Sequence, residues 1–332
     1  MKKILLLFLL VSFSYFAQAQ DAIVSQYYAS SLFLNPAIAG TENVGNLQFI
    51  SRNRLGNNVS GYHLHQFSVV FPIMLKNADN SFIISRNGYL GGGGISFYNE
   101  TSGFSSELKN TGLLLSLAYS VKLTTKQLLS FGIQGGAVYR TLDDSNLQWG
   151  SQYENLTGFN SGITPSVTIL FERMFLPVFN AGIEWRYIAA QNSLIPSAVA
   201  GFAAANINRP YDSFLYTAFS YIPVLFKFYA GAQIFVGENK TISPNVFVLR
   251  QRNAYQTNVG CAYNQTFRNA ETKTFTLQVG SWYRWNDSFI VSFAFLFPKY
   301  DVAVSYDFNA SSFRYYEAQE GALEVSCKYY LQ

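Results

Sequence analysis

Two histidines are the residues of this chain best suited to acid–base or metal chemistry. His63 and His65 are two positions apart, so on a β-strand both side chains would lie on one face, where they could hold a metal ion. Phe67, Val69 and Phe71 continue that face, which favours an interfacial or loop-proximal pair over a metal site. A Ser-His-Asp hydrolase would need one of these histidines, and the chain has no Gly-x-Ser-x-Gly nucleophile turn. The sequence therefore predicts no enzyme, no cofactor and no metal.

Two further patterns could suggest ligand binding. The glycine run 91–94 lacks the Lys-Ser/Thr pair and the helix of a phosphate loop, so we interpret it as glycines that let a strand bend or another segment approach closely. Asp143, Asp144 and Glu154 share one long polar segment. They lack the ligand spacing of a calcium loop, which indicates a solvated loop.

Charged residues on the polar faces of alternating segments form a third group: Arg140, Arg284, Asp301, Asp307, Glu324 and Lys328. In a narrow enclosed space such charges must pair or stay hydrated, because an unpaired buried charge is costly. We favour a structural ion-pair network, and the alternative is a polar pathway for a transported solute.

The segments that carry these charges alternate between apolar and polar residues, which is the period of a β-strand. In the last one, Leu323, Val325 and Cys327 point one way while Glu324 and Ser326 point the other. The same alternation marks residues 131–140, 274–285, 289–297 and 301–308. Each segment runs for about ten residues, the length that a tilted strand needs to cross a bilayer.

The composition indicates what surrounds these strands. Aromatic residues make up 17% of the chain and charged residues 13%, about half the charged share of an ordinary soluble domain. Mean hydropathy is only +0.09, and after the first twenty residues no run of eighteen apolar residues occurs, which excludes helical membrane spans. A barrel with an apolar outer face and a polar inner face explains both facts, whereas a soluble sandwich or propeller would be polar outside.

We therefore predict an all-β fold, a transmembrane antiparallel up-and-down β-barrel over residues 46–332. Sixteen segments qualify as strands, and fourteen fits equally well if two belong to loops, within a range of 12 to 16. Turn signals occur at 124–126, 237–239, 286–287 and 298–299. Longer polar segments alternate with these tight turns, as in outer-membrane barrels, and an even strand number would place both termini of the barrel chain in the periplasm.

Residues 1–19 predict a cleaved export signal. Lys2 and Lys3 precede an apolar stretch, 4–16, that is too short to span a bilayer. Residues 17–19, Ala-Gln-Ala, have the form of a cleavage site, so the mature chain would begin at Gln20 without a lipid-bearing cysteine. The expected location is the outer membrane of a Gram-negative cell, with membrane lipid as the surroundings.

Charge and cysteine content exclude two other classes. The net charge is only +4 and no basic run occurs, so a nucleic-acid partner is not expected. Cys261 and Cys327 are too few for a disulfide framework, and both occupy apolar positions of predicted strands. We interpret them as small lipid-facing or packing residues.

Residues 20–45 do not alternate and form a separate N-terminal segment. Pro36 disfavours helical geometry at Asn35, and Gly40 can adopt a conformation barred to other residues. Such an ordered, non-strand segment could plug the barrel lumen or dock a periplasmic partner, and the alternative is a loose leader before the first strand.

This segment carries a specific resemblance. The PorP/SprF membrane proteins of the type IX secretion system of Bacteroidetes open with Q-D-x-x-x-S-Q-Y and then L-x-L-N-P-A-x-A-G. This chain has Gln20, Asp21, Ser25, Gln26, Tyr27, Leu32, Leu34, Asn35, Pro36, Ala37, Ala39 and Gly40 in that arrangement. Later blocks also match, at 91–94, 99–103, 119–120, 283–284, 305–307, 321 and 324. The whole mature chain is therefore similar to this family.

The resemblance implies a non-enzymatic role in type IX secretion or gliding motility, as a partner-specific scaffold. Its implied partners are components of the secretion machine or a large secreted adhesin, received through the C-terminal domain of that adhesin. The candidate partner-binding or plug residues are Ser25, Gln26, Tyr27, Leu34, Asn35, Pro36, Ala37 and Gly40. The long loops expected to present the cargo surface are 101–110, 143–160, 188–197 and 309–320. The runner-up is a passive porin or a channel for small hydrophobic molecules.

Overall fold

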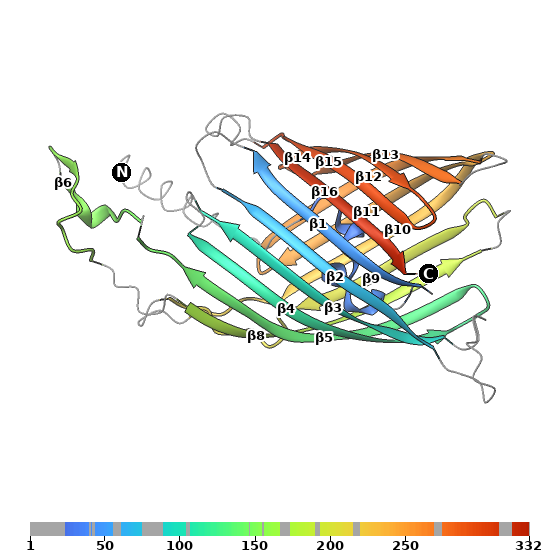
Figure 1. Cartoon of the computed structure of the whole chain (residues 1–332), viewed down its shortest axis with the longest axis horizontal. Coiled ribbons are helices and arrows are strands. Elements are labelled where there is room, and N and C mark those ends of the chain that lie inside the picture. Colours follow the sequence, from blue (N-terminus) through green and yellow to red (C-terminus); the bar gives the residue numbers. More distant parts are fainter. Residues whose placement is uncertain are drawn as a thin grey trace, which may run out of the picture.

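The computed structural model describes residues 24–39, 41, 44–55, 61–74, 89–103, 107–145, 147–154, 156–166, 173–189, 193–214, 220–268, 274–311 and 321–331. Fourteen antiparallel strands form a closed barrel (Figure 1). They are β1 Gly45–Leu55, β2 His63–Met74, β3 Tyr89–Ser102, β4 Leu108–Lys122, β5 Gln127–Leu142, β8 Arg173–Ile188, β9 Ser197–Ala205, β10 Leu225–Gly237, β11 Lys240–Gln251, β12 Ala254–Phe267, β13 Phe275–Arg284, β14 Ser288–Leu296, β15 Tyr300–Asn309 and β16 Gly321–Leu331. The predicted fold class and a strand number of fourteen are confirmed.

The barrel closes by pairing its first and last strands. β1 pairs antiparallel with β16, from Gly45 opposite Leu331 to Leu55 opposite Gly321. β1 therefore begins at the same end of the barrel at which β16 ends, and we name this end the terminal end. We name the opposite end the far end. Outer-membrane barrels have short turns in the periplasm and longer loops outside, and the longest connection, between β5 and β8, lies at the far end, so the far end is the external one.

The connection between β5 and β8 contains two more short strands. β6, Tyr153–Glu154, and β7, Gly158–Phe159, pair with each other and not with the barrel. Figure 1 shows this hairpin beyond the barrel wall, on the side away from the C-terminus. These two short strands lie in a connection between barrel strands and do not cross the membrane.

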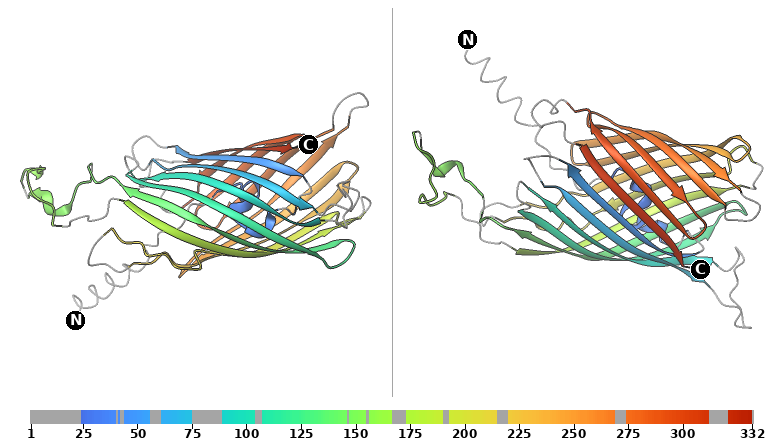
Figure 2. Two further views of the ribbon diagram at one scale, coloured as in Figure 1. Left: turned by 60° about the horizontal axis from the view of Figure 1, so that its bottom comes forward. Right: turned by 45° about the horizontal axis from the view of Figure 1, so that its top comes forward.

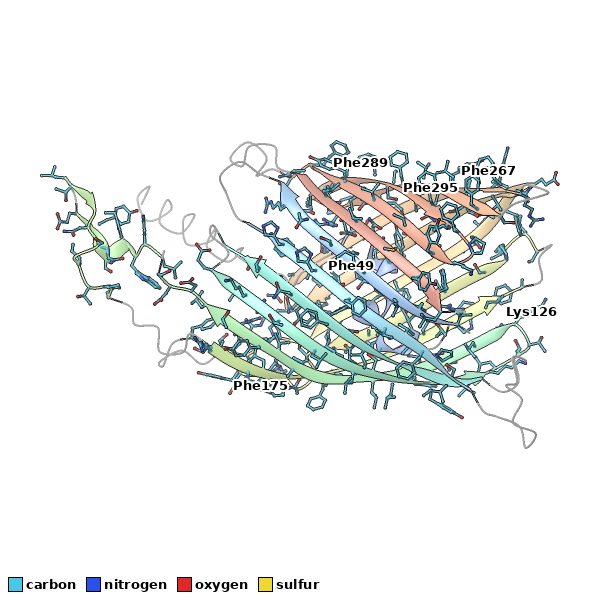
Figure 3. The ribbon with its side chains drawn as sticks, in the orientation of Figure 1. Phe49, Lys126, Phe175, Phe267, Phe289 and Phe295 are labelled. Carbon is cyan, nitrogen blue, oxygen red and sulfur yellow. The ribbon has the colours of Figure 1, made fainter. Side chains whose placement is uncertain are left out.

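Side chains alternate across the barrel wall as the sequence predicts. On β4, Leu113, Leu115 and Leu117 point outward and are 55–58% exposed, while Leu114 and Ser116 between them are buried. Figure 3 shows phenylalanines projecting from the outer surface of several strands. An apolar, aromatic outer face is what a bilayer requires of the strands that cross it. Among the described residues, no helix is long and apolar enough to cross a membrane.

The four predicted tight turns are present. Two of them use an asparagine in the left-handed conformation, Asn239 at φ +57° and Asn286 at φ +56°. Asparagine tolerates this region better than most residues, because its short polar side chain bonds to the local backbone. These turns join antiparallel neighbours and thereby set the register of the adjacent strands.

The segment before β1 lies inside the lumen, visible as the blue coil within the barrel in Figure 2. It consists of the 3-10 turn η2, Tyr27–Ala29, the single helical turn α2, Ser31–Leu34, and the 3-10 turn η3, Pro36–Ile38. Asn35 is extended, at φ −157° and ψ 123°, as expected of a residue before proline. Its side-chain oxygen accepts a hydrogen bond from the Ala37 N–H and thereby caps η3.

The strand order corrects one expectation about the loops. Segments 101–110, 143–160 and 309–320 connect strands at the far end, whereas 188–197 joins β8 to β9 at the terminal end. A single cargo surface built from all four loops is therefore wrong, because two opposite ends of a barrel cannot share a face. Residues 104–106, 146, 155, 190–192 and 312–320 of these loops lie outside the described residues, as do Gly40 and residues 1–23, which include the predicted leader 1–19.

Candidate functional site

Four charged side chains meet around Ser25 inside the barrel, and we name them the charged cluster: Arg52 of β1, Arg284 of β13, Asp307 of β15 and Glu324 of β16. The Ser25 hydroxyl donates to Asp307 Oδ2 at 2.6 Å. The same oxygen accepts from Arg52 Nη1 at 2.5 Å and from Arg284 Nη2 at 2.6 Å. One small side chain of the N-terminal segment therefore connects charges from three strands.

Ion pairs hold the charged cluster together. Arg52 lies 2.9 Å from the Asp307 carboxylate and 3.1 Å from that of Glu324. Arg284 lies 3.0 Å from Asp307. All four side chains are at most 11% exposed. Two positive and two negative charges balance, which such burial demands.

The peptide backbone of the segment binds the same carboxylate. Glu324 accepts from the Ser25 N–H at 2.8 Å and from the Gln26 N–H at 2.6 Å. The Gln26 amide donates to Ser305 Oγ at 3.0 Å and to the Glu324 carbonyl at 3.2 Å, and it accepts from Ser326 Oγ at 2.6 Å. Because both ends of the Gln26 amide are used, an apolar residue there would leave several buried groups without partners.

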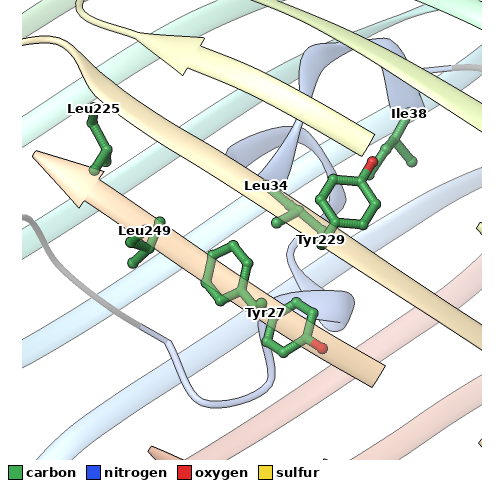
Figure 4. Packing of buried hydrophobic residues seen from close by; sticks show 7 residues of the cluster. Tyr27, Leu34, Ile38, Leu225, Tyr229 and Leu249 are labelled. Atoms are coloured by element: carbon green, nitrogen blue, oxygen red, sulfur yellow. The ribbon is translucent and has the colours of Figure 1, made fainter. Parts of the chain in front are cut away.

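Tyr27 anchors the next part of the segment. Its ring stacks on Phe247 with 4.5 Å between the centroids, and its hydroxyl donates to Asn245 Oδ1 at 2.7 Å. Figure 4 shows Tyr27 and Leu34 packed against Leu249 and neighbouring residues of the wall.

Asn35 ties the other end of the segment to the wall. Its amide nitrogen donates to the carbonyls of Ile183, at 2.9 Å, and Phe202, at 3.3 Å. It also lies 3.2 Å from the hydroxyl of Tyr229, which itself donates to the buried carboxylate of Glu184. Asn35 is fully buried, so its contacts replace the water that its amide would otherwise bind.

Glycines in the wall make room for this end. A Cβ atom at Gly132 would lie 2.2 Å from the Ala37 nitrogen and 2.3 Å from the Pro36 carbonyl carbon. At Gly182 it would lie 2.0 Å from the Asn35 side-chain oxygen. At these two positions the wall is therefore shaped to the side chain of Asn35 and to the backbone of η3, with no space for any larger residue.

The glycine run 91–94 lies on β3. At Gly94 a Cβ atom would lie 2.6 Å from Leu32 of the N-terminal segment. At Gly93, on the other face, it would meet the ring of Phe71. One glycine of the run therefore allows the close approach that the sequence suggested.

The structure brings together three of the six charges predicted to form a network, Arg284, Asp307 and Glu324. Arg140 lies elsewhere in the lumen, 2.6 Å from Asp212 and 2.7 Å from Asn110.

The remaining two charges lie near the terminal end of the barrel. Asp301 is opposite Lys328 in the register of β15 and β16, and it accepts from the Tyr330 hydroxyl at 2.7 Å. The Lys328 ammonium lies 5.0 Å from the centre of the Tyr330 ring. Three separate polar groups therefore replace the single network that the sequence suggested.

Charged residues of the site were missed from the sequence, Arg52 and Glu184 among them. Arg52 belongs to the charged cluster, and Glu184 receives hydrogen bonds from Tyr229 and, at 2.8 Å, from Arg186. Arg52 had a usable signal, since it follows Asn46 and Gln48 at even spacing on β1 and all three are buried inward. Glu184 lies in the middle region of the chain, where the alternation is weaker.

The two histidines and the two cysteines lie away from the lumen. His63 and His65 point outward from β2, on the face that also carries Phe67, and His63 Nδ1 lies 2.8 Å from Asn53 Oδ1. Cys261 and Cys327 are free and exposed on the outer face. Within the described residues no three His, Cys, Asp or Glu side chains are grouped as metal ligands would be.

Above the N-terminal segment the lumen opens into a cavity of about 760 Å³, which we name the vestibule. Phe33 and Leu34 of the segment form part of its lining, together with Leu114 and Val138 of the wall. Its other lining residues include 220–223 and 251–254, which lie at the far end. The vestibule therefore faces the external side, and the segment forms its floor.

A closed, antiparallel barrel with an aromatic outer face and a polar lumen defines an outer-membrane β-barrel protein. A family model described as "Type IX secretion system membrane protein PorP/SprF" matches residues 16–329. The chain belongs to this family of secretion-system membrane proteins, which is not an enzyme family, and it is located in the outer membrane.

Comparison with solved structures returns other membrane barrels. The chain is 10% identical to the CymD monoaromatic hydrocarbon channel, with a TM-score of 0.47 over 92% of this chain and 93% of that one. It is 11% identical to the Pseudomonas putida toluene transporter TodX, with a TM-score of 0.48 over 91% and 93%. These likenesses are too distant to say what the chain binds. No curated protein matches it.

Proposed function

We propose that this barrel is a partner-specific scaffold of the type IX secretion and gliding machinery, not a conduit. The observation that carries the proposal is the N-terminal segment, whose Ser25 and Gln26 are fixed by buried ion pairs and whose Asn35 is fixed by backbone carbonyls. A lumen filled in this way leaves the outer vestibule as a surface for a partner. The partner is a machine component, or a large secreted adhesin received through its C-terminal domain.

The vestibule has the mixed character of a protein-binding surface. Phe33 of the segment and Leu114 and Val138 of the wall give it an apolar lining, while the ion pair of Arg140 and Asp212 lies among its polar lining. Such an arrangement, apolar at the centre with polar groups at fixed positions, suits the insertion of an apolar side chain or turn of another protein.

Co-purification tests this proposal directly. The tagged barrel, extracted from cells after crosslinking, should recover a secretion component or an exported protein. Ile222→Asp, which places a charge in the vestibule lining, should reduce that recovery at least tenfold. Leu156→Asp is the control, because Leu156 is 98% exposed on the hairpin between β5 and β8 and does not line the vestibule.

One outcome would contradict docking in the vestibule, and another would contradict the scaffold role itself. Loss of the partner with Leu156→Asp and not with Ile222→Asp would move the docking surface out of the vestibule. A large, steady conductance of the purified wild-type protein in planar bilayers would favour the alternative, a porin or small-molecule channel, since a filled lumen should pass little current.

A further inference from the structure

The path of the N-terminal segment carries an inference that does not depend on the proposed function. We infer that the segment enters the lumen from the external end, with Val24 on the cell-surface side of the charged cluster. The segment then passes through the barrel once and reaches β1 at the periplasmic end.

The wall residues that bind the segment show its direction. Ser25 is bound by Arg52, near the far end of β1, and by Glu324, near the far end of β16. Ser31 is bound by Gln48, four residues closer to the start of β1. Four residues of strand correspond to about 13 Å, so the chain moves toward the periplasm between Ser25 and Ser31.

The positions of the two ends of the segment are consistent with this direction. Val24 lines the vestibule together with Ser102, Leu108 and Ala254, which lie at or beside the far-end limits of β3, β4 and β12. At its other end the segment continues to Gly45, the first residue of β1 at the terminal end.

The chain before Val24 is too short to return to the periplasm. If the leader is cut after Ala19, four residues precede Val24, and four residues span at most about 14 Å. The strand from Arg52 down to Gly45 alone covers seven residues, about 23 Å. The segment itself also occupies the lumen, and Figure 4 shows its side chains packed against β10 and β11 of the wall.

This path has a consequence for assembly. A leader that stayed anchored in the inner membrane would hold Ser25 on the periplasmic side, and Ser25 could not reach Arg52 and Glu324 from outside. If residues 1–19 are a cleaved leader, its removal would therefore precede closure of the barrel. The segment bonds to both strands of the closing pair, through Gln48 on β1 and Ser326 on β16, so it is captured as they join.

Labelling of intact cells tests the inference. In a background with Cys261→Ala and Cys327→Ala, a Gly-Ser linker with one cysteine is inserted between Gln20 and Asp21, and a bulky, membrane-impermeant maleimide is applied. Asn253→Cys, in the far-end turn between β11 and β12, and Thr125→Cys, in the terminal-end turn between β4 and β5, serve as controls.

The linker cysteine and Asn253→Cys should both be labelled on intact cells, at least tenfold more than Thr125→Cys. Thr125→Cys should be labelled only after the outer membrane is permeabilised. Labelling of the linker only after permeabilisation, or only after unfolding, would overturn the inference. Heat-dependent migration on gels selects folded protein, and a second insertion between Ala22 and Ile23 replaces the first if that variant does not fold.

Discussion

Different kinds of interaction hold the two ends of the N-terminal segment in the barrel. At Ser25 and Gln26 the segment is bound by the charged cluster, whose Arg52 and Glu324 are already paired with each other across the β1–β16 junction. At Asn35 to Ala37 it is bound by backbone carbonyls and by close contact with Gly132 and Gly182. We name these the charged end and the packed end.

The difference indicates what each end contributes. The free energy of a buried charge pair depends steeply on which side chains form it. The charged end therefore fixes the position of the segment relative to β1 and β16, the two strands that close the barrel. Close packing depends on volume, so the packed end excludes any wall residue larger than glycine. A segment fixed at both ends in this way remains in place, which agrees with a scaffold.

The largest effect should come from the charged end. Glu324→Ala removes the acceptor of two backbone N–H groups and leaves Arg52 partly unpaired in a buried site. Loss of one partner of a buried ion pair costs about 3–5 kcal/mol. Urea unfolding from lipid vesicles should show a loss of this size in the free energy of unfolding.

Asp301→Ala is the matched control for that variant. Asp301 is a less buried inward carboxylate on the neighbouring strand, outside the charged cluster, and its removal should cost about 1 kcal/mol or less. Equal losses for the two variants would mean that the charged end has no special role in holding the segment.

At the packed end, a single added methyl group should be enough to displace η3. Gly132→Ala places a Cβ against the backbone of Pro36 and Ala37, which cannot move aside as a flexible side chain would. Overpacking of this kind costs about 1–3 kcal/mol. The same unfolding measurement should detect the loss, and conductance in planar bilayers should rise if the segment leaves the lumen.

Gly135→Ala on the same strand separates the effect of overpacking from the effect of replacing glycine by alanine in a β-strand. A Cβ atom there would meet only the ring of Phe179, at 3.4 Å. Alanine is favoured over glycine in a strand by about 0.5–1 kcal/mol, so this variant should be neutral or slightly stabilised. A similar loss in both variants would show that β5 tolerates no change at all, and the distinction between the two ends would weaken.

The sequence predicted the fold better than the site, and the reason is physical. Which residues face lipid depends only on the period of two within each strand, so Leu323, Val325 and Cys327 could be assigned without knowing their neighbours. Which charges pair depends on register and on closure of the barrel. Arg52 and Glu324 are 272 residues apart, and they meet because β1 pairs with β16.

The N-terminal segment shows the same limit. Its motif could be identified from Ser25, Gln26 and Asn35, but its partners on the wall are glycines, polar side chains, backbone carbonyls and apolar side chains from strands far along the chain. Gly132 and Gly182 have no local signal that distinguishes them from glycines in turns. Only the closed barrel shows that they lie against η3.

The smallest effect should come from the middle of the segment, where stacking and not the hydroxyl dominates. Tyr27→Phe keeps the ring on Phe247 and removes the hydrogen bond to Asn245. Asn245 Oδ1 also accepts from Trp282 Nε1 at 2.6 Å, so its oxygen keeps a partner. The expected loss in unfolding free energy is therefore about 0.5 kcal/mol, at the low end for a hydrogen bond.

Tyr153→Phe, whose exposed hydroxyl donates to Gln148 outside the barrel, should cost nothing measurable and controls for loss of a phenol. A loss above about 2 kcal/mol for Tyr27→Phe would exceed the ordinary worth of one hydrogen bond. That result would place a third polar anchor between the charged end and the packed end, and the segment would then be held along its whole length.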